Sequence, residues 1–264
     1  MADPAELGRA LAARGVPPLA AVEWTDEIPS TSDRLKALAR AGAAEWTAVL
    51  ADRQTGGRGR EGRAWASPAG GLYLSVLLRP RFAAVGLLPL AAGVAVAEAV
   101  AEWGIAAQLK WPNDVLLDGR KLGGVLAEAS SGSGGVDWVV LGIGVNVAVT
   151  REALPPDVRD AAASLADASS VRPPVSDVAA AVLAHLRLCY DGLRADPPRI
   201  VETWRARAVD WWGELVDVET ARGTLRGRMR GVDTDGALLV DLEGEESHRI
   251  LSGEVRRLRR AVRG

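Results

Sequence analysis

The sequence predicts a mixed α/β domain followed by a small all-β domain. Through about residue 212, segments with a helical spacing of apolar residues alternate with strand-like apolar segments. From Gly213 onward the pattern changes to short strands separated by turn residues, which is typical of a small β-barrel. We therefore expect two domains, residues 1–212 and residues 213–264.

Composition and charge favour a soluble cytoplasmic protein. The chain has 264 residues, of which 48% are hydrophobic and 25% are charged, and this suits one large or two unequal domains. The net charge of −2 gives no overall field that would attract nucleic acid. The single Cys189 excludes an intramolecular disulfide and is compatible with a reducing cytosol.

The sequence predicts neither export nor membrane insertion. The first residues lack a basic region followed by an apolar stretch, so they do not resemble a signal peptide. The longest apolar run, residues 82–97, contains Gly86, Pro89 and Gly93 and falls short of the ~18 residues of a membrane span. We expect this run to form a buried core helix.

The first half of the large domain alternates helices and strands. Pro4 and Gly15 bound a first helix, and Ser30 offers an N-cap to the second. Apolar residues recur at helical or strand spacing through the rest of this half. The expected elements are helices over residues 4–14, 30–42 and 85–103, and strands over residues 21–25, 47–52 and 72–78.

The remaining elements follow from turn signals and apolar runs. Asp118 and Gly119, between two apolar segments, are a two-residue hairpin signal. After it we expect strands over residues 121–128 and 136–147 joined by a flexible turn at 130–135, a mobile polar segment at 150–160, and helices over 177–193 and 200–209. The small domain should hold strands over 215–220, 224–231, 237–241 and 247–251, with an Arg-rich tail from Val255 that is either a solvated end or a ligand-facing edge.

The stretch with the clearest chemical character is residues 52–65, which we call the Gly/Arg loop. Glycine lets a backbone approach a ligand closely and leaves an empty loop flexible. Arginine offers planar, permanently charged forks that suit carboxylate and phosphate. Trp65 ends the loop with a flat apolar face that could cover a ring. The loop is therefore predicted to close over an anion with Gly56, Gly57, Gly59, Gly62, Arg53, Arg58, Arg60 and Arg63.

Other interpretations of the Gly/Arg loop are weaker. The spacing of Gly57, Gly59 and Gly62 fits the dinucleotide fingerprint, but that motif needs a helix directly after it, and here a loop follows. A P-loop needs Gly-Lys-Ser/Thr, which the chain lacks. An RNA-binding Arg/Gly segment would be longer and repeated. A plain solvated loop would leave the interleaved glycines and arginines unexplained.

Two further segments carry candidate binding groups. Residues 108–121 contain Asn113, which could hydrogen-bond a base or ribose, and Asp114, which could hold Mg²⁺ through oxygen, although both residues also suit a plain turn. This segment also holds two of the three lysines of the chain, Lys110 and Lys121, and the third is Lys36. Farther along, mid-strand glycines at 142 and 144 indicate either a ligand against the sheet or a bulge.

Together these motifs resemble those of the biotin protein ligases. The matching elements are Gly57-Arg-Gly-Arg-x-Gly-Arg-x-Trp65, Lys110-Trp-Pro-Asn-Asp114, Lys121-Leu-Gly-Gly124 and Gly142-x-Gly144-x-Asn146. Order and spacing agree over roughly residues 25–150. The resemblance implies a class II synthetase-like catalytic domain with a mixed sheet, followed by an SH3-like domain. One departure is Ser32-Asp33, where many relatives have Asn after Ser-Thr, so the contact made by Ser32 can differ.

The implied reaction has two steps. The carboxylate of biotin attacks the α-phosphate of ATP and gives biotinyl-5′-adenylate and pyrophosphate. A lysine of a biotin carboxyl carrier protein domain then attacks the mixed anhydride. Lys121, Arg60 and Arg58 are the implied catalytic residues, with Mg²⁺ on Asp114. The implied biotin contacts are Ser30, Thr31, Ser32, Gln54, Gly57, Arg58, Gly59, Arg60, Lys121, Gly142 and Gly144, and the implied ATP contacts are Arg58, Arg60, Arg63, Trp65, Asn113 and Asn146.

Two alternative functions have to be distinguished from this one. A lipoate or octanoate ligase shares the fold and the acyl-lysine product, but the Arg/Gly loop and Lys-Trp-Pro-Asn-Asp favour biotin. A nucleic-acid-binding protein could use the Gly/Arg loop and the Arg-rich tail. Some family members carry an N-terminal DNA-binding domain, but only 29 residues precede Ser30 here, so we expect a monofunctional ligase that binds no DNA. A homodimer through a sheet edge is compatible with the sequence.

Overall fold

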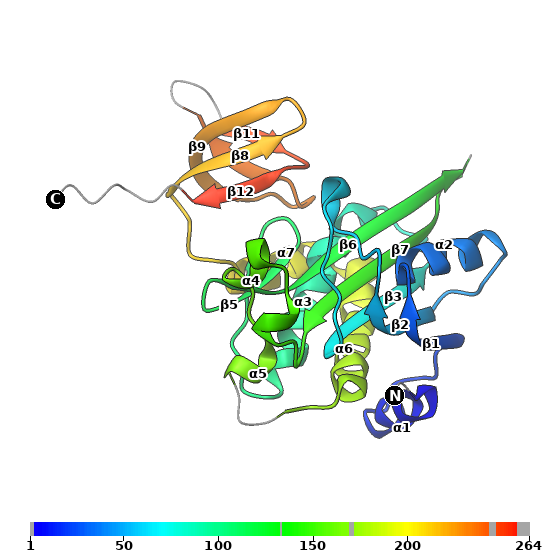
Figure 1. The fold of residues 1–264 in the computed structure, drawn as a ribbon. Coiled ribbons are helices and arrows are strands. Elements are labelled where there is room, and N and C mark those ends of the chain that lie inside the picture. The colour runs from blue at the N-terminus through cyan, green and yellow to red at the C-terminus, as the bar shows by residue number, and fades with distance from the viewer. Residues whose placement is uncertain (1–2, 133, 169–171, 243–246, 258–264) are drawn as a thin grey trace.

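The large sheet is mixed, as expected. The computed structural model describes residues 3–132, 134–168, 172–242 and 247–257 (Figure 1). Seven strands are ordered β1-β2-β3-β7-β6-β5-β4, and β1 runs parallel to β2 while the other neighbours are antiparallel. Their bounds are β1 Ala21–Ile28, β2 Thr47–Gln54, β3 Gly71–Leu78, β4 Gln108–Lys110, β5 Asp114–Leu117, β6 Arg120–Gly132 and β7 Gly135–Asn146.

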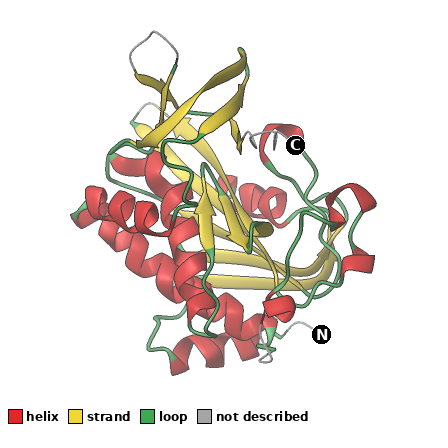
Figure 2. Cartoon of the chain, turned by 90° about the vertical axis from the view of Figure 1, so that its left-hand side faces the viewer, coloured by secondary structure: helices red, strands yellow, loops and turns green. Residues whose placement is uncertain are grey.

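Helices cover the two faces of this sheet unequally. The larger core cluster joins α1 (Pro4–Ala13), α3 (Leu88–Ala101), α6 (Val175–Ala195) and α7 (Pro197–Arg207) to one face, and Figure 2 shows this layer. Helix α2 (Thr31–Arg40) packs on the opposite face, through a smaller cluster. Because successive strand residues point to opposite faces, Val49 packs with α2 and Leu50 with the larger layer.

The apolar run becomes a core helix, with a later start than expected. Residues 84–87 form a 3₁₀ turn and the α-helix begins at Leu88, because Pro89 has no N–H and a fixed φ that suit only the first turn. By length and composition the segment Ala84–Ala101 could cross a membrane, but 67% of it is buried within the fold. It packs against the sheet, α6 and α7, which is the environment of a soluble core helix.

The expected hairpin is present, whereas a second turn is shorter than expected. Asp118 (φ 49°) and Gly119 (φ 73°) both have positive φ, as the tight turn between β5 and β6 requires. The prediction of a flexible turn at 130–135 is wrong at both ends, because the β6–β7 ladder continues to the pair Gly132–Gly135. Ser133 lies outside the described residues. Backbone pairing overrides the low strand propensity of these glycines and serines.

A second, antiparallel sheet follows the large one. Its strand order is β11-β10-β9-β8-β12, with β8 Leu215–Thr220, β9 Gly223–Val232, β10 Leu238–Asp241, β11 Ser247–Ile250 and β12 Glu254–Arg257. The first four strands are confirmed. A fifth strand, which the sequence did not predict, begins where the Arg-rich tail was expected, and Val255 is buried in it opposite Val218. The remainder of the Arg-rich tail lies outside the described residues, and the domain boundary at 212 stays a prediction.

Trp111 ties the large sheet to the small one. It is only 1% exposed, and its indole N–H donates to the carbonyl of Gly236, just before β10, at 2.9 Å. Trp111→Phe should lower the free energy of unfolding by about 1–3 kcal/mol, because the carbonyl is left without its donor. Trp24→Phe is the matched control: Trp24 donates to Asp52 at the edge of the sheet, where water can replace the bond. Urea unfolding measures both losses, and equal losses would contradict the prediction.

Candidate active site

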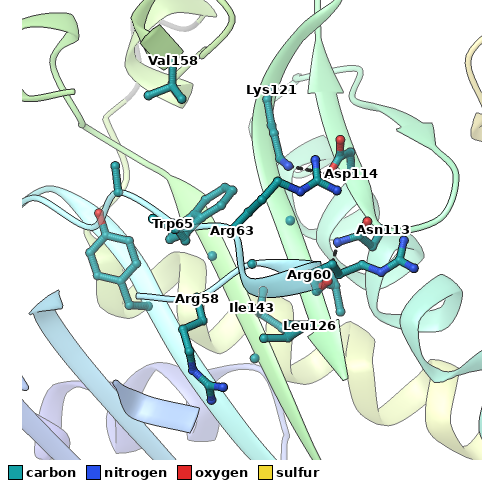
Figure 3. Close-up of a pocket in the computed structure, with 18 of the residues that line it drawn as sticks. Arg58, Arg60, Arg63, Trp65, Asn113, Asp114, Lys121, Leu126, Ile143 and Val158 are labelled. Atoms are coloured by element: carbon teal, nitrogen blue, oxygen red, sulfur yellow. Dashed lines mark hydrogen bonds and ion pairs between the residues drawn. The ribbon is translucent and has the colours of Figure 1, made fainter. Parts of the chain in front are cut away.

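A pocket lies on the α2 face of the large sheet, at the point where glycines replace the larger residues of β7. Along β7, Trp138 and Val140 pack under Leu35 of α2, and the next two residues on the same face are Gly142 and Gly144. Alternation along a strand therefore changes a covered core into an open floor. The cavity holds about 270 Å³ and runs from the start of α2 to the Gly/Arg loop and β6 (Figure 3).

The structure brings almost all the predicted site residues to this one pocket. The predicted residues among those that line it are Ser30, Thr31, Ser32, Gln54, Arg58, Gly59, Arg60, Arg63, Trp65, Asn113, Asp114, Lys121, Gly142, Gly144 and Asn146. They come from four segments of the chain, residues 30–32, 54–65, 113–121 and 142–146. The sheet order, which places β7 beside β3 and β6 beside β7, brings them together.

The floor glycines permit close contacts that no other residue would allow. A Cβ at Gly144 would lie 2.7 Å from the Trp65 ring, and a Cβ at Gly142 would lie 2.8 Å from the Ser32 hydroxyl. Both distances are too short for real carbon contacts. The mid-strand glycines are thus required by the approach of a ring and a hydroxyl to the sheet, and no bulge is present between β6 and β7 at this point.

One end of the pocket is a network of buried hydroxyls and an amide. Gln54 Oε1 accepts from the backbone N–H and the hydroxyl of Thr31, at 2.9 and 3.1 Å. The Ser75 hydroxyl lies 2.8 Å from that of Thr31 and 3.0 Å from that of Ser32. Ser30 caps α2 by accepting from the N–H of Asp33, which confirms the capping interpretation. This end suits a compact polar group with donors and acceptors.

The start of the Gly/Arg loop is held by a cluster of four charges. Arg58 donates to Asp33 at 2.7 Å and to Glu128 at 3.0 Å, and Lys36 lies 2.8 Å from each of these carboxylates. Two cations thus bridge two anions. In Figure 3 the Arg58 side chain points away from Arg60 and Lys121. Arg58 therefore anchors the loop in this structure, and a direct contact with an anionic ligand stays a prediction.

The middle of the loop contacts the second sheet. Arg60 donates to the Gly253 carbonyl at 3.0 Å and to the Ser252 hydroxyl at 2.7 Å, both between β11 and β12. Arg63 forms an ion pair with Glu254. Burial lowers the pKa of Arg60 from its ordinary value. Because Gly253 and Glu254 line the pocket, the two sheets enclose it jointly.

A lysine–carboxylate–lysine arrangement lies at the other end of the pocket. Asp114 Oδ1 is 2.6 Å from Lys121 Nζ, and Asp114 Oδ2 is 3.8 Å from Lys110 Nζ. Lys121 Nζ also lies 5.3 Å from the centre of the Trp65 ring. The indole N–H of Trp65 is buried without a hydrogen-bond partner. Positive charge and an unused donor therefore gather where an anion could bind.

Two amides at this end support the backbone. Asn113 Nδ2 donates to the Val125 carbonyl at 2.7 Å, and Asn146 Nδ2 donates to the Ala163 carbonyl at 2.9 Å. Each amide nitrogen is thus engaged, and the role of both side chains in holding a nucleotide stays a prediction.

Comparison with known proteins identifies the family. The model of the Biotin/lipoate A/B protein ligase family matches residues 24–146, and that of the Biotin protein ligase C terminal domain matches residues 213–257. The biotin--[acetyl-CoA-carboxylase] ligase of Mycobacterium tuberculosis is 38% identical over 226 residues, which cover 81% of each chain. The bifunctional ligase/repressor BirA of Bacillus spizizenii is 34% identical over 88% of this chain and 72% of its own. The chain belongs to the biotin protein ligase family.

Solved ligase structures share the arrangement of both sheets. The biotin protein ligase from Aquifex aeolicus in complex with biotin and ATP superposes with a TM-score of 0.78 and 35% identity, over 90% of this chain and 99% of that one. The expected fold class and the resemblance to the biotin protein ligases are thereby confirmed.

Two of the predicted binding residues have protein contacts that the sequence did not suggest. Gly57 does not line the pocket: a Cβ there would meet the Trp65 carbonyl at 2.5 Å and the Ser67 hydroxyl at 2.6 Å, so this glycine lets the loop fold onto itself. Asp114 was expected to hold Mg²⁺, but its carboxylate is bound to lysine. Within the described residues, no group of three His, Cys, Asp or Glu could hold a metal.

Sequence reasoning missed several residues of the ligase pocket. Lys110 and Gly124 lie within the quoted motifs and could have been named from them. Ser75 lies behind the pocket lining, where its buried hydroxyl meets those of Thr31 and Ser32, and a buried serine in an otherwise hydrophobic strand is a signal that was not used. Gly253 and Glu254 are about 190 residues from the loop they face, and no local pattern predicts such a contact. The single cysteine, Cys189, is not among the pocket residues. Its thiol is buried on α6, in the helix layer on the other face of the large sheet, and burial raises its pKa to about 12.

Proposed function

We propose that this protein activates biotin with ATP and transfers it to a lysine of a biotin carboxyl carrier protein domain. The observation that carries the proposal is the single pocket that joins a hydroxyl and amide end, a glycine floor and a cluster of cations. Its relatives are named as biotin ligases, and a similar structure contains biotin and ATP.

In the first step two anions must meet. A carboxylate oxygen of biotin attacks the α-phosphorus of ATP, the phosphorus–oxygen bond to pyrophosphate breaks, and an acyl-adenylate forms. Mutual repulsion opposes this approach, so fixed cations in a partly dry site should lower the barrier most. Lys121 is best placed for the task, and Asp114 orients its ammonium group from 2.6 Å. The unpartnered N–H of Trp65 can donate to an oxygen of the ligand.

Other pocket residues are proposed to bind the rest of biotin and the adenosine of ATP. The hydroxyl and amide end at Thr31, Ser32 and Gln54 would take the polar ring of biotin, and the glycine floor would take its tail. Trp65, Asn113 and Asn146 surround the space assigned to adenosine. In the second step the amine of the carrier lysine attacks the acyl carbon, an amide bond forms, and AMP leaves while the amine gives up a proton.

Mg²⁺ would enter with ATP and neutralise phosphate charge. The described residues do not form a metal cage, and Asp114 is already bound to Lys121, so the phosphates themselves would supply most ligands. No step above depends on the metal.

One assay tests the proposed function. The protein is incubated with ATP, a carrier domain and either labelled biotin or labelled lipoate. Biotin should label the carrier in an ATP-dependent manner and lipoate should not. Labelling by lipoate alone would assign the protein to the lipoate branch of the same family.

We also propose that the ligase acts in the cytoplasm without recognising DNA. The net charge of −2 gives no attraction to a polyanion, and most arginines of the second sheet are paired with acids, such as Arg226 with Asp217 and Arg257 with Glu214. In mobility-shift assays with operator-like duplexes, with and without biotin and ATP, we expect no sequence-dependent complex. Phosphate contacts weaken strongly by about 200 mM salt. A protein–DNA complex that persists at that salt concentration and depends on the DNA sequence would contradict this proposal.

A further inference from the structure

Exposed apolar side chains are rare on this protein and are placed unevenly. Among the described residues, the large hydrophobic side chains that are exposed are Val158 (38%), Leu188 (69%) and Leu251 (76%). A single exposed hydrophobic residue needs no explanation. One of these three, Val158, lines the pocket, and Leu251 lies two residues before Gly253, which lines it from a different part of the chain.

Leu251 lies in the turn between β11 and β12, to which Arg60 of the Gly/Arg loop is hydrogen-bonded. The next two residues accept hydrogen bonds from Arg60, through the Ser252 hydroxyl and the Gly253 carbonyl. Gly253 also lines the pocket, and two residues of chain span at most about 7 Å, so Leu251 is at the rim. The turn is held by side chains of the other sheet, and yet Leu251 itself projects into solvent.

Val158 belongs to the rim as well. It lies on the short helix α4 (Pro156–Arg159), lines the pocket and remains partly exposed. In Figure 3 Val158 and Arg60 lie at opposite ends of the labelled group, with Trp65 and Arg63 between them. The mouth thus carries one apolar side chain from the large domain and one from the second sheet.

The charged groups of the rim are already paired with one another. Arg63 contacts Glu254 and lies 3.7 Å from Glu61, and Arg60 is bound to the Ser252 turn. Because these arginines and glutamates offset one another, the group has little net charge to attract a charged partner. The side chains of Val158 and Leu251, in contrast, are exposed. What docks here should therefore be recognised through apolar contact.

We propose that Leu251, together with Val158, forms the apolar contact for the carrier domain beside its acceptor lysine. This inference rests on the proposed function, because that reaction brings a folded protein to the mouth. A lysine amine ends a four-carbon stem, so the surface that bears it must lie against the rim when the amine enters the pocket. The product must also leave, which suits a small, transient interface in which one or two side chains dominate.

The test compares two equally exposed leucines. Leu251→Asp should raise the KM for the carrier domain by about tenfold, as expected when a dominant interface side chain is lost. Leu188→Asp is the matched control, because Leu188 lies on α6, which covers the opposite face of the large sheet. In this variant the KM for the carrier domain should stay within twofold of that of the parent protein. Leu251→Ser removes the apolar contact without adding charge and should also raise the KM.

Two further readouts separate docking from chemistry. Biotin-dependent exchange of pyrophosphate into ATP reports adenylate formation, and transfer to hydroxylamine reports acyl transfer without a protein partner. Both should be unchanged in Leu251→Asp. Equal carrier KM values for the Leu251 and Leu188 variants would overturn the inference. So would an equal loss of exchange and hydroxylamine transfer, or an effect of Asp without an effect of Ser. If the parent protein shows no biotin-dependent exchange, it is the proposed function that fails.

Discussion

Replacing Lys121 by Gln is expected to lower the rate of biotinyl-adenylate formation by about 10²- to 10³-fold while the protein stays folded. Gln keeps most of the length and some hydrogen bonding of lysine, but it removes the charge that lies between the two anions. The side chain is 37% exposed and contributes no apolar core contact, so stability should change little. Adenylate formation is measured as AMP-containing product in a single turnover without a carrier.

Lys36→Gln supplies the control for this variant. Lys36 is also held by carboxylates, at 2.8 Å from Asp33 and from Glu128, but it does not line the pocket. Its loss should slow the reaction far less than the loss of Lys121. Adenylate formation at the parent rate in Lys121→Gln would show that Lys121 is only the partner of Asp114 at a strand end.

Arg60→Gly is expected to leave some adenylate formation and to destroy retention of the adenylate. Arg60 closes the Gly/Arg loop onto the second sheet with two hydrogen bonds, and glycine removes both while adding flexibility. The acyl-adenylate should then escape and acylate lysines at random. The variant is mixed with ATP, biotin and an unrelated lysine-rich protein, and that protein is blotted for biotin.

Glu61→Gly separates flexibility from the contact with the second sheet. Glu61 already has a φ of 55°, a conformation that glycine adopts without strain, so this change loosens the same loop and leaves both bonds of Arg60 in place. Bystander labelling should be strong for Arg60→Gly and weak for Glu61→Gly. Equal labelling by the two variants would contradict the assigned role of Arg60. Amide exchange in the loop should also slow when ligand binds, and equal protection with and without ligand would exclude a ligand-ordered lid.

The sequence was informative wherever a local signal fixes a local structure. Ser30 caps α2, the Asp118-Gly119 pair makes its hairpin, and glycines 142 and 144 make the floor of the pocket. The start of α3 could also have been placed at Leu88 from Pro89 alone. In contrast, Glu254–Arg257 contains one apolar residue, so its pairing with β8 left almost no pattern to detect.

The partners of the arginines could not be predicted in the same way. The Gly/Arg loop predicts anion binding, but three of its arginines contact protein groups in this structure. Arg58 binds Asp33 and Glu128, Arg60 binds the turn before β12, and Arg63 binds Glu254. These contacts depend on how the two sheets are placed, which no periodicity in the chain records. The same is true of Asp114, whose pairing with two lysines no turn sequence predicts.

The most direct test of the account is the exchange of labelled pyrophosphate into ATP by the purified protein in the absence of any carrier. If the pocket joins biotin and the α-phosphate of ATP next to Lys121, exchange should require biotin, should not occur with lipoate, and should fall by about 10²-fold or more in Lys121→Gln. Exchange that proceeds without biotin, or at the parent rate in Lys121→Gln, would contradict the account.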